Sequence, residues 1–222
     1  MNSIEVIEAA MTRDLKHLNN VSHNIANLNT PGYLAKQSFD QVLANGQTVF
    51  EEKASDRDGG VRDSTRALDL AVLGAGYFVV EKHGQQFLTR DGRFHLNPEG
   101  YLTHQTGALA LGSRGPIKIS GTDISVQGKG EVVSANAVVD KLLIAQSSSP
   151  AVAGQGLLLS SNMQLVSDYQ LKPFALNGAN VDASHETIKM MELSRHMQSL
   201  QKAAAAYDQM MQTGINEIGK SK

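Results

Sequence analysis

Residues 190–211 read MMELSRHMQSLQKAAAAYDQMM, and this stretch decides the fold. Its apolar side chains recur every three or four residues, which is the a/d spacing of a heptad repeat. Such a stripe covers a narrow face of a helix, so it can be buried only against a facing helix. The pattern predicts a long helix, from about residue 183 to 218, that needs a helical partner. The apolar positions of this stripe are Met190, Leu193, Met197, Leu200, Ala204, Tyr207, Met211 and Ile218.

A second stripe with the same period lies near the N-terminus and predicts an amphipathic helix from residue 3 to about 28. Pro31 and Gly32 should end this helix. Each stripe misses one position in register, at Asp14 in the first and at Gly214 in the second. Because the periods agree, the simplest partner for one end of the chain is the other end, or the ends of neighbouring copies. The apolar positions of the first stripe are Ile4, Ile7, Met11, Leu18, Val21, Ile25 and Leu28.

The two helices allow two interpretations. They could pack on the rest of the chain as ordinary core helices, or they could form a coiled coil. The narrow stripe favours the coiled coil, because a core helix usually has a wider apolar face. Several of its C-terminal positions are methionine, alanine or tyrosine side chains that pack weakly, so we expect the seam to become ordered in an assembly.

The middle of the chain predicts β structure. Short runs of strand-forming residues between 68 and about 145 are separated by glycine-containing turns, which is typical of an antiparallel sheet that closes into a small sandwich or barrel. The predicted class is therefore α+β, with terminal helices in a coiled-coil-like inner domain and an antiparallel β-rich middle domain. The expected boundaries are 1–32 for the first helix, 33–67 for a connector, 68–145 for the β domain, 146–179 for a second connector and 180–222 for the last helix.

Composition excludes several classes of function. The 222 residues contain no cysteine, which excludes disulfides and thiolate metal sites. A net charge of −2 gives no general affinity for nucleic acid or anionic lipid. We expect no membrane insertion, because no run of about 18 apolar residues occurs. The N-terminus lacks a basic segment followed by an apolar one, so we also expect no cleaved signal peptide.

Enzyme chemistry finds little support. The seven histidines offer no i, i+4 pair on a predicted helix, and we interpret His95 and His104, in adjacent predicted strands, as ordinary sheet-surface residues. The run at residues 184–186, Ser-His-Glu, begins a helix and fits a capping role better than a catalytic triad. Gly74 and Gly76 fit a tight turn, because a dinucleotide loop needs a third glycine and a following helix. We therefore expect no catalytic, cofactor or metal site.

Residues 19–33, NNVSHNIANLNTPGY, place five asparagines and one serine before the proline, where they lower helix propensity. They could form a fraying helix end with asparagine caps. They could instead act as a packing and register signal between subunits, because amide side chains can hydrogen-bond across closely packed helices.

These residues resemble a known family. Residues 24–33 match N-(I/L)-A-N-x-x-T-x-G-(F/Y), the N-terminal signature of the bacterial flagellar rod and hook proteins. Residues 68–78 resemble the family's L-D-x-A-(I/V)-x-G-x-G-(F/Y)-F, residues 89–94 its T-R-x-G-x-F, and residues 99–103 the x-G-x-L-T turn that follows. Residues 178–182, GANVD, and the last helix resemble its C-terminal signature.

The resemblance implies a non-enzymatic axial subunit of the flagellar basal-body rod, whose terminal helices pack into the core of a helical tube that crosses the periplasm and transmits torque. It implies self-association, other rod and hook-basal-body subunits as partners, and export by the flagellar type III apparatus. The expected assembly interface comprises Ile4, Ile7, Met11, Leu18, Val21, Asn24, Ile25, Asn27, Met190, Leu193, Met197, Leu200, Ala204, Tyr207 and Met211. The expected motif turns contain Pro31, Gly32, Gly74, Gly76, Gly92 and Gly178.

Two questions stay open at this point. Residues 190–196 depart from the acidic E-x-Q-R-x-(Y/F)-E run common in the distal rod protein, which favours its proximal-rod relative of similar build. The competing class of function is a secreted β-rich binding module whose coiled-coil stem forms a closed dimer or trimer.

Overall fold

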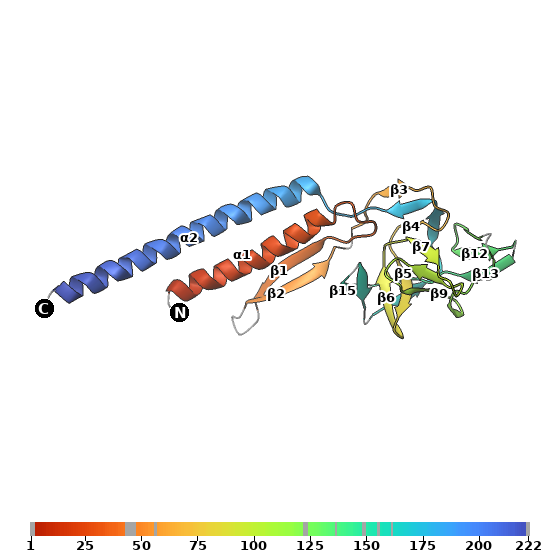
Figure 1. Ribbon diagram of the computed structural model, residues 1–222, viewed down its shortest axis with the longest axis horizontal. Coiled ribbons are helices and arrows are strands. Elements are labelled where there is room, and N and C mark those ends of the chain that lie inside the picture. Colours follow the sequence, from red (N-terminus) through yellow and green to blue (C-terminus); the bar gives the residue numbers. More distant parts are fainter. Residues whose placement is uncertain are drawn as a thin grey trace. The chain divides into compact units, whose positions relative to one another are not determined.

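The computed structural model describes residues 3–42, 48–55, 57–121, 124–135, 137–147, 150–154, 156–160 and 162–220. The chain divides into two compact units, and Figure 1 traces both. The helical unit comprises Met1–Ala26, Ser38–Glu51 and Asp182–Lys222. The β unit comprises Asn27–Gln37 and Glu52–Val181. The chain therefore passes from one unit to the other four times.

Two long helices dominate the helical unit and confirm the helices predicted at both ends. Helix α1 is Ser3–Ala26 and helix α2 is Ala183–Lys220. They run antiparallel and lie side by side (Figure 1). Asp182 caps α2, because its Oδ1 accepts hydrogen bonds from the backbone N–H groups of Ser184 at 2.9 Å and His185 at 3.1 Å.

A two-stranded hairpin accompanies α1. Its strands are β1 (Lys36–Val42) and β2 (Thr48–Ala54). The ring of Phe50 meets the His17 ring edge-on, with centroids 5.1 Å apart, and the Lys16 ammonium lies 5.4 Å from the Phe50 centroid. His17 Nδ1 also lies 2.8 Å from Ser38 Oγ. These contacts attach the hairpin to α1.

The β unit is built around one large antiparallel sheet, which confirms the predicted β-rich middle. Its strand order is β15-β16-β6-β5-β9-β8-β7, with β10 on β9 and with β14 joining β5 to β17. The bounds are β5 Tyr77–Lys82, β6 Gln85–Thr89, β7 Phe94–Leu96, β8 Leu102–His104, β9 Leu109–Gly112, β10 Gly115–Pro116, β14 Ile144–Gln146, β15 Ala151–Gly154, β16 Leu157–Leu159 and β17 Gln164–Val166.

Strand β5 lies in the middle of the sheet, and both of its faces are buried. Phe78 and Val80 point into the larger apolar cluster, with Leu70, Phe94 and Ile144. On the other face, Tyr77 and Val79 point into a smaller cluster with Leu88 and Leu158. Leu34 and Ala54, which belong to segments that connect the units, pack against this smaller cluster.

Three small sheets complete the β unit: β11-β12-β13, β18-β4 and β19-β3. Their bounds are β3 Val61–Asp63, β4 Leu70–Leu73, β11 Ile124–Val126, β12 Glu131–Ser134, β13 Ala137–Lys141, β18 Gln170–Pro173 and β19 Ala175–Asn177. Within the region that predicts β structure, Lys118 forms only an isolated bridge, to Tyr101. The segments expected as connectors, 33–67 and 146–179, contain strands β1–β3 and β15–β19.

Candidate functional site

The structure brings the predicted apolar stripes of α1 and α2 together. Most stripe side chains are half-buried, and Val21 is buried. Asn24 is buried and Asn27 half-buried, whereas Met211 is 51% exposed. The burial of Gly214 and Ile218 is outside what the structure describes. The half-buried positions are Ile4, Ile7, Met11, Leu18, Ile25, Leu28, Met190, Leu193, Met197, Leu200, Ala204 and Tyr207.

Two polar contacts fix the register of the helix pair. Asp14 Oδ2 lies 2.5 Å from His196 Nδ1, and Asn24 Nδ2 donates a hydrogen bond of 3.2 Å to Glu186 Oε2. In each pair the two residue numbers add to 210. Residue n of α1 therefore faces residue 210 − n of α2. The gap in the first stripe is thus filled by Asp14, whose side chain is 5% exposed.

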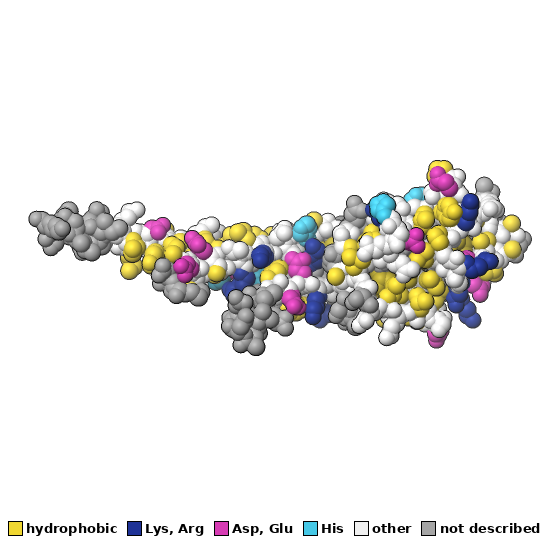
Figure 2. All heavy atoms as spheres, turned by 90° about the horizontal axis from the view of Figure 1, so that it is seen from below, with side chains coloured by type: hydrophobic (Ala, Val, Ile, Leu, Met, Phe, Trp, Pro, Cys, Tyr) yellow, Lys and Arg dark blue, Asp and Glu magenta, His cyan; other side chains and the backbone are white. Residues whose placement is uncertain are grey.

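This register leaves the end of α2 without a partner in α1. By the same sum Ser3, the first residue of α1, faces Tyr207, so the rest of α2 extends past the start of α1 (Figure 1). Met210 is 72% exposed and Met211 51% exposed in this stretch. Figure 2 shows further hydrophobic side chains at the surface along the described part of the helical unit. The helices thus offer apolar surface that the free chain does not bury.

Two of the asparagines near the end of α1 are buried, whereas Asn19 and Asn29 are exposed. Asn20 and Asn24 are buried, and Nδ2 of Asn20 has no hydrogen-bond partner among the described residues. Buried polar side chains between helices favour one register over others, because a shifted register leaves them unpaired. The register interpretation of the asparagines concerns contacts between subunits, and it stays a prediction, because Asn24 pairs here with Glu186 of the same chain.

In the β unit, the motif segments converge on one another. The backbone N–H of Gly32 donates to Asn177 O at 2.7 Å, which joins the first motif to the last. Gly32 has φ of +66° and no room for a side chain, since a Cβ there would lie 2.2 Å from the backbone nitrogen of Asp91. The first motif therefore also docks on the TRDGRF segment. We call this convergence the motif junction.

Asn177 and Gly92 hold the second motif in the motif junction. The Asn177 side chain makes both hydrogen bonds of a strand partner to Val72, accepting from its N–H at 2.8 Å and donating to its C=O at 3.0 Å. Leu70 N–H donates to Gly92 O at 3.0 Å, and a Cβ on Gly92 would lie 1.7 Å from Leu70 O. Only a glycine permits this approach.

Arg90 fastens the turn that contains Gly74 and Gly76. Its buried guanidinium donates to Gly76 O at 2.6 Å and Gly74 O at 2.5 Å, and it forms an ion pair with Asp58 at 2.5 Å. The turn fits the sequence interpretation, because Gly74 has φ of +82° and a strand, β5, follows it. The backbone N–H of Gly178, in the last motif, donates a hydrogen bond to Gly60 O at 2.6 Å.

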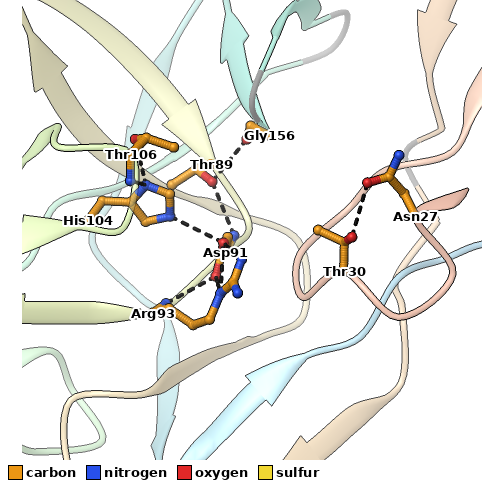
Figure 3. Close-up of polar contacts among 8 residues, drawn as sticks. All are labelled: Asn27, Thr30, Thr89, Asp91, Arg93, His104, Thr106 and Gly156. Atoms are coloured by element: carbon orange, nitrogen blue, oxygen red, sulfur yellow. Dashed lines mark hydrogen bonds and ion pairs between the residues drawn. The ribbon is translucent and has the colours of Figure 1, made fainter. Parts of the chain in front are cut away.

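A buried charge cluster surrounds Asp91 (Figure 3). Arg93 grips the carboxylate through Nε and Nη2, at 2.9 and 2.6 Å, and His104 Nε2 lies 3.4 Å from Oδ2. On the other side of the ring, His104 Nδ1 accepts a hydrogen bond from Thr106 N–H and lies 2.8 Å from Thr106 Oγ1. Burial would raise the pKa of Asp91, but His104 and Arg93 outweigh it and lower that pKa. Asp91 in turn raises the pKa of Arg93.

His104 corrects the sequence interpretation. It is fully buried, with Phe94 edge-on at 5.8 Å, whereas His95 points to the exposed face of the same sheet. The two side chains alternate because Phe94, not His95, pairs with His104. The roles of Arg90, Asp91 and Asn177 were not predicted, although the motifs that contain the first two were recognised.

Membrane-spanning and metal-binding features are both absent from the described residues. In this part of the chain, no helix has the length and hydropathy needed to cross a membrane. The same residues contain no cluster of three or more His, Asp or Glu side chains that could hold a metal ion.

Comparison with protein families defines the class. Residues 4–33 match the family model "Flagella basal body rod protein", residues 71–134 "Flagellar hook protein FlgE/F/G D1 domain", and residues 173–217 "Flagellar basal body rod FlgEFG protein C-terminal". The three segments cover most of both helices, strands β5–β9 of the central sheet, and Gly32, Asp91 and Asn177 of the motif junction. The chain is thus of the rod and hook class of structural flagellar proteins, which is not a class of enzymes.

Individual relatives show which members of this class the chain resembles. The chain is 30% identical to the flagellar basal-body rod protein FlgF of Caulobacter vibrioides, over 92% of this chain and 93% of the relative. It is 36% identical to FlgF of Rhizobium meliloti, over 53% of this chain and 50% of the relative. The flagellar hook protein FlgE of R. meliloti is 32% identical over 63% and 37%. The chain belongs to the flagellar basal-body rod and hook family, and FlgF is the member that it resembles over nearly its whole length.

Proposed function

We propose that this chain is a structural axial subunit of the flagellar basal-body rod, which polymerises through its terminal helices into a helical tube. The proposal rests chiefly on the register of the helix pair, which leaves the apolar end of α2 uncovered in the free chain. The similarity to FlgF over 92% of the chain supports it. A neighbouring subunit would bury this end of α2 against helices of its own.

In this proposal the terminal helices form a coiled-coil-like inner assembly domain, at 1–32 and 180–222, and residues 68–145 form the β-rich domain. The predicted stripe residues, with Asn24 and Asn27, are the assembly interface. In this proposal the contact between copies is heterologous, with the uncovered end of α2 in one copy against a different surface of the next. Such a contact generates a helical filament when the rotation between copies does not close. Many repeated helix contacts would give the stiffness that torque transmission needs.

The proposed location is the flagellar basal body, where the rod crosses the periplasm. The proposed partners are further copies of this chain, other rod and hook-basal-body subunits, and the flagellar type III export apparatus, which would export the chain without a cleaved signal. The departure of residues 190–196 from the acidic run of the distal rod protein supports a position in the proximal rod.

Electron microscopy of basal bodies from a strain that lacks the gene tests the proposal. We expect the rod to stop short, and a plasmid copy of the gene to restore its length. A complete rod in the deletion strain would contradict the proposal. Light scattering of the purified chain tests the competing class, because a binding module with a coiled-coil stem would form a closed oligomer whose size does not depend on concentration.

A further inference from the structure

Three segments of the β unit that lead to or from the helical unit meet at one side chain, Asn180. Its Oδ1 accepts a hydrogen bond of 2.5 Å from the backbone N–H of Ala35. Its Nδ2 donates to Arg57 O at 2.7 Å and to Ser55 O at 3.3 Å. Its own backbone N–H donates to Tyr33 O at 3.2 Å. Both N–H groups and the oxygen of the side-chain amide are therefore engaged.

The chain passes between the helical unit and the β unit four times, and each passage lies at an end of one of these three segments. Residues 27–37 run from the end of α1 into the start of β1, residues 52–60 contain the end of β2 and the chain that follows it, and residues 178–181 lead into α2. Backbone contacts join the same segments without Asn180. Ser55 N–H donates to Ala35 O at 2.8 Å, and a Cβ on Gly59 would lie 2.1 Å from Gly178 O. The segments are thus close-packed, and Asn180 is the side chain that bonds to each of the other two.

We propose that Asn180 is a positioning residue that clasps the three connecting segments, so that they leave the β unit as one body and not as separate tethers. This inference rests on the proposed function, because torque passes between the inner and outer parts of a rod only if the connection between them is stiff. Asparagine suits this position, since the site needs one acceptor and two donors on a short side chain. Aspartate would face the carbonyl groups of Ser55 and Arg57 with an oxygen.

The full-length chain can test the clasp before any assembly. In Asn180→Ala the amide of Ala35 loses its acceptor, and we expect its hydrogen exchange to accelerate about tenfold. The amide of Val72, bonded to Asn177 Oδ1, should keep its protection and so report that the β unit is folded. Asn180→Asp provides a second variant of almost unchanged volume.

The absence of cysteine allows clean spin labelling at Lys202→Cys on α2 and Gln86→Cys on β6, which are both exposed. We expect the distance distribution between the labels to broaden in both Asn180 variants. The matched control is Asn97→Asp, whose Oδ1 only accepts a turn hydrogen bond from Tyr101 N–H and can still do so. Unchanged exchange at Ala35 with an unchanged distance distribution would overturn the clasp, as would equal broadening in the control.

The two proposals fail in different experiments. If the clasp is wrong, the isolated Asn180 variants behave as the parent chain does, whatever the rod looks like. If the rod function is wrong, the deletion strain builds a complete rod, whatever Asn180 does in the isolated chain.

Discussion

Asp14 of α1 and His196 of α2 are separated by 182 residues in the sequence and by 2.5 Å in the structure. The Asp14 side chain is 5% exposed and that of His196 is 53% exposed. A carboxylate can only accept, so the Nδ1 of His196 donates to it. The pair places a charge-assisted hydrogen bond inside an otherwise apolar stripe, where it specifies register at some cost in stability.

The pair predicts an asymmetry between its two partners. His196→Ala leaves a buried carboxylate unpaired and should destabilise the helix pair by about 1–2 kcal/mol, a value reduced because His196 is half exposed. Asp14→Leu removes the buried charge, restores the stripe and should be neutral or stabilising. Thermal unfolding followed by circular dichroism at 222 nm measures both. A His196→Ala chain as stable as Asp14→Leu would contradict this account.

The stripes could be predicted because their period is a local property of the sequence, but the register could not. Nothing near Asp14 identifies His196 as its partner, and Asn24 finds Glu186 only once the helices lie antiparallel. Strand β3 is a second example. Val61–Asp63 are all exposed and show no alternation, and they form a strand because β19, more than 100 residues later, pairs with them.

The motif turns were predictable as turns, because glycine and proline mark them. The tertiary neighbour of each glycine could not be predicted. Gly32 and Gly74 both have positive φ, yet Gly32 contacts the backbone at Asp91, whereas a Cβ on Gly74 would meet no atom of the described residues within 4 Å. A local pattern reports the conformation of a residue but not its tertiary neighbour.

These two glycines give a matched pair of substitutions. Gly74→Ala should cost about 1 kcal/mol, the strain of a left-handed backbone alone. Gly32→Ala carries the same strain and a clash with Asp91 N that only a backbone shift can relieve, so it should cost about 2–4 kcal/mol. Urea unfolding of the two variants measures the difference. Equal midpoints would show that the motif junction does not hold Gly32 tightly.

The charge cluster predicts how the β unit responds to acid. The pKa of Asp91 is lower in the folded chain than its ordinary value of about 3.9. Its stabilisation is therefore fully present above pH 4–5 and is lost as the pH falls through the folded pKa. Asp91→Asn should lower the free energy of unfolding by about 1–3 kcal/mol at pH 7 and weaken its decline below pH 4. Urea titrations from pH 3 to 7 measure this.

Asp63→Asn is the control for the acid experiment, since Asp63 pairs with Lys172 at 2.7 Å but its side chain is 83% exposed. Exposed pairs contribute little, so this variant should follow the parent at every pH. An Asp91→Asn chain with the parent's pH dependence would show that the cluster does not stabilise the ionised carboxylate.

A charged side chain introduced between α1 and α2 should prevent assembly without unfolding the β unit. Leu200→Asp or Ile25→Asp places a carboxylate between the helices, where it cannot remain both ionised and buried. We expect the β unit to stay folded, as judged by amide protection in β5, while rods fail to form and swimming is lost. Gln201→Asp, on the exposed side of α2, is the control. Normal motility in cells carrying either seam variant would contradict the proposed interface.

The end of α2 allows assembly to be tested without disturbing the free chain. Met211 lies past the point where α1 begins and is 51% exposed, so we expect Met211→Glu to leave thermal unfolding of the isolated chain unchanged within about 0.5 kcal/mol. In the rod the same side chain would be buried by a neighbour, and a carboxylate there should prevent assembly. Gln212→Glu adds the same charge one residue further along, away from the stripe, and should be tolerated. Because folding and assembly would respond differently to one substitution, swimming of the Met211→Glu strain at the parental rate would rule out this part of α2 as an assembly contact.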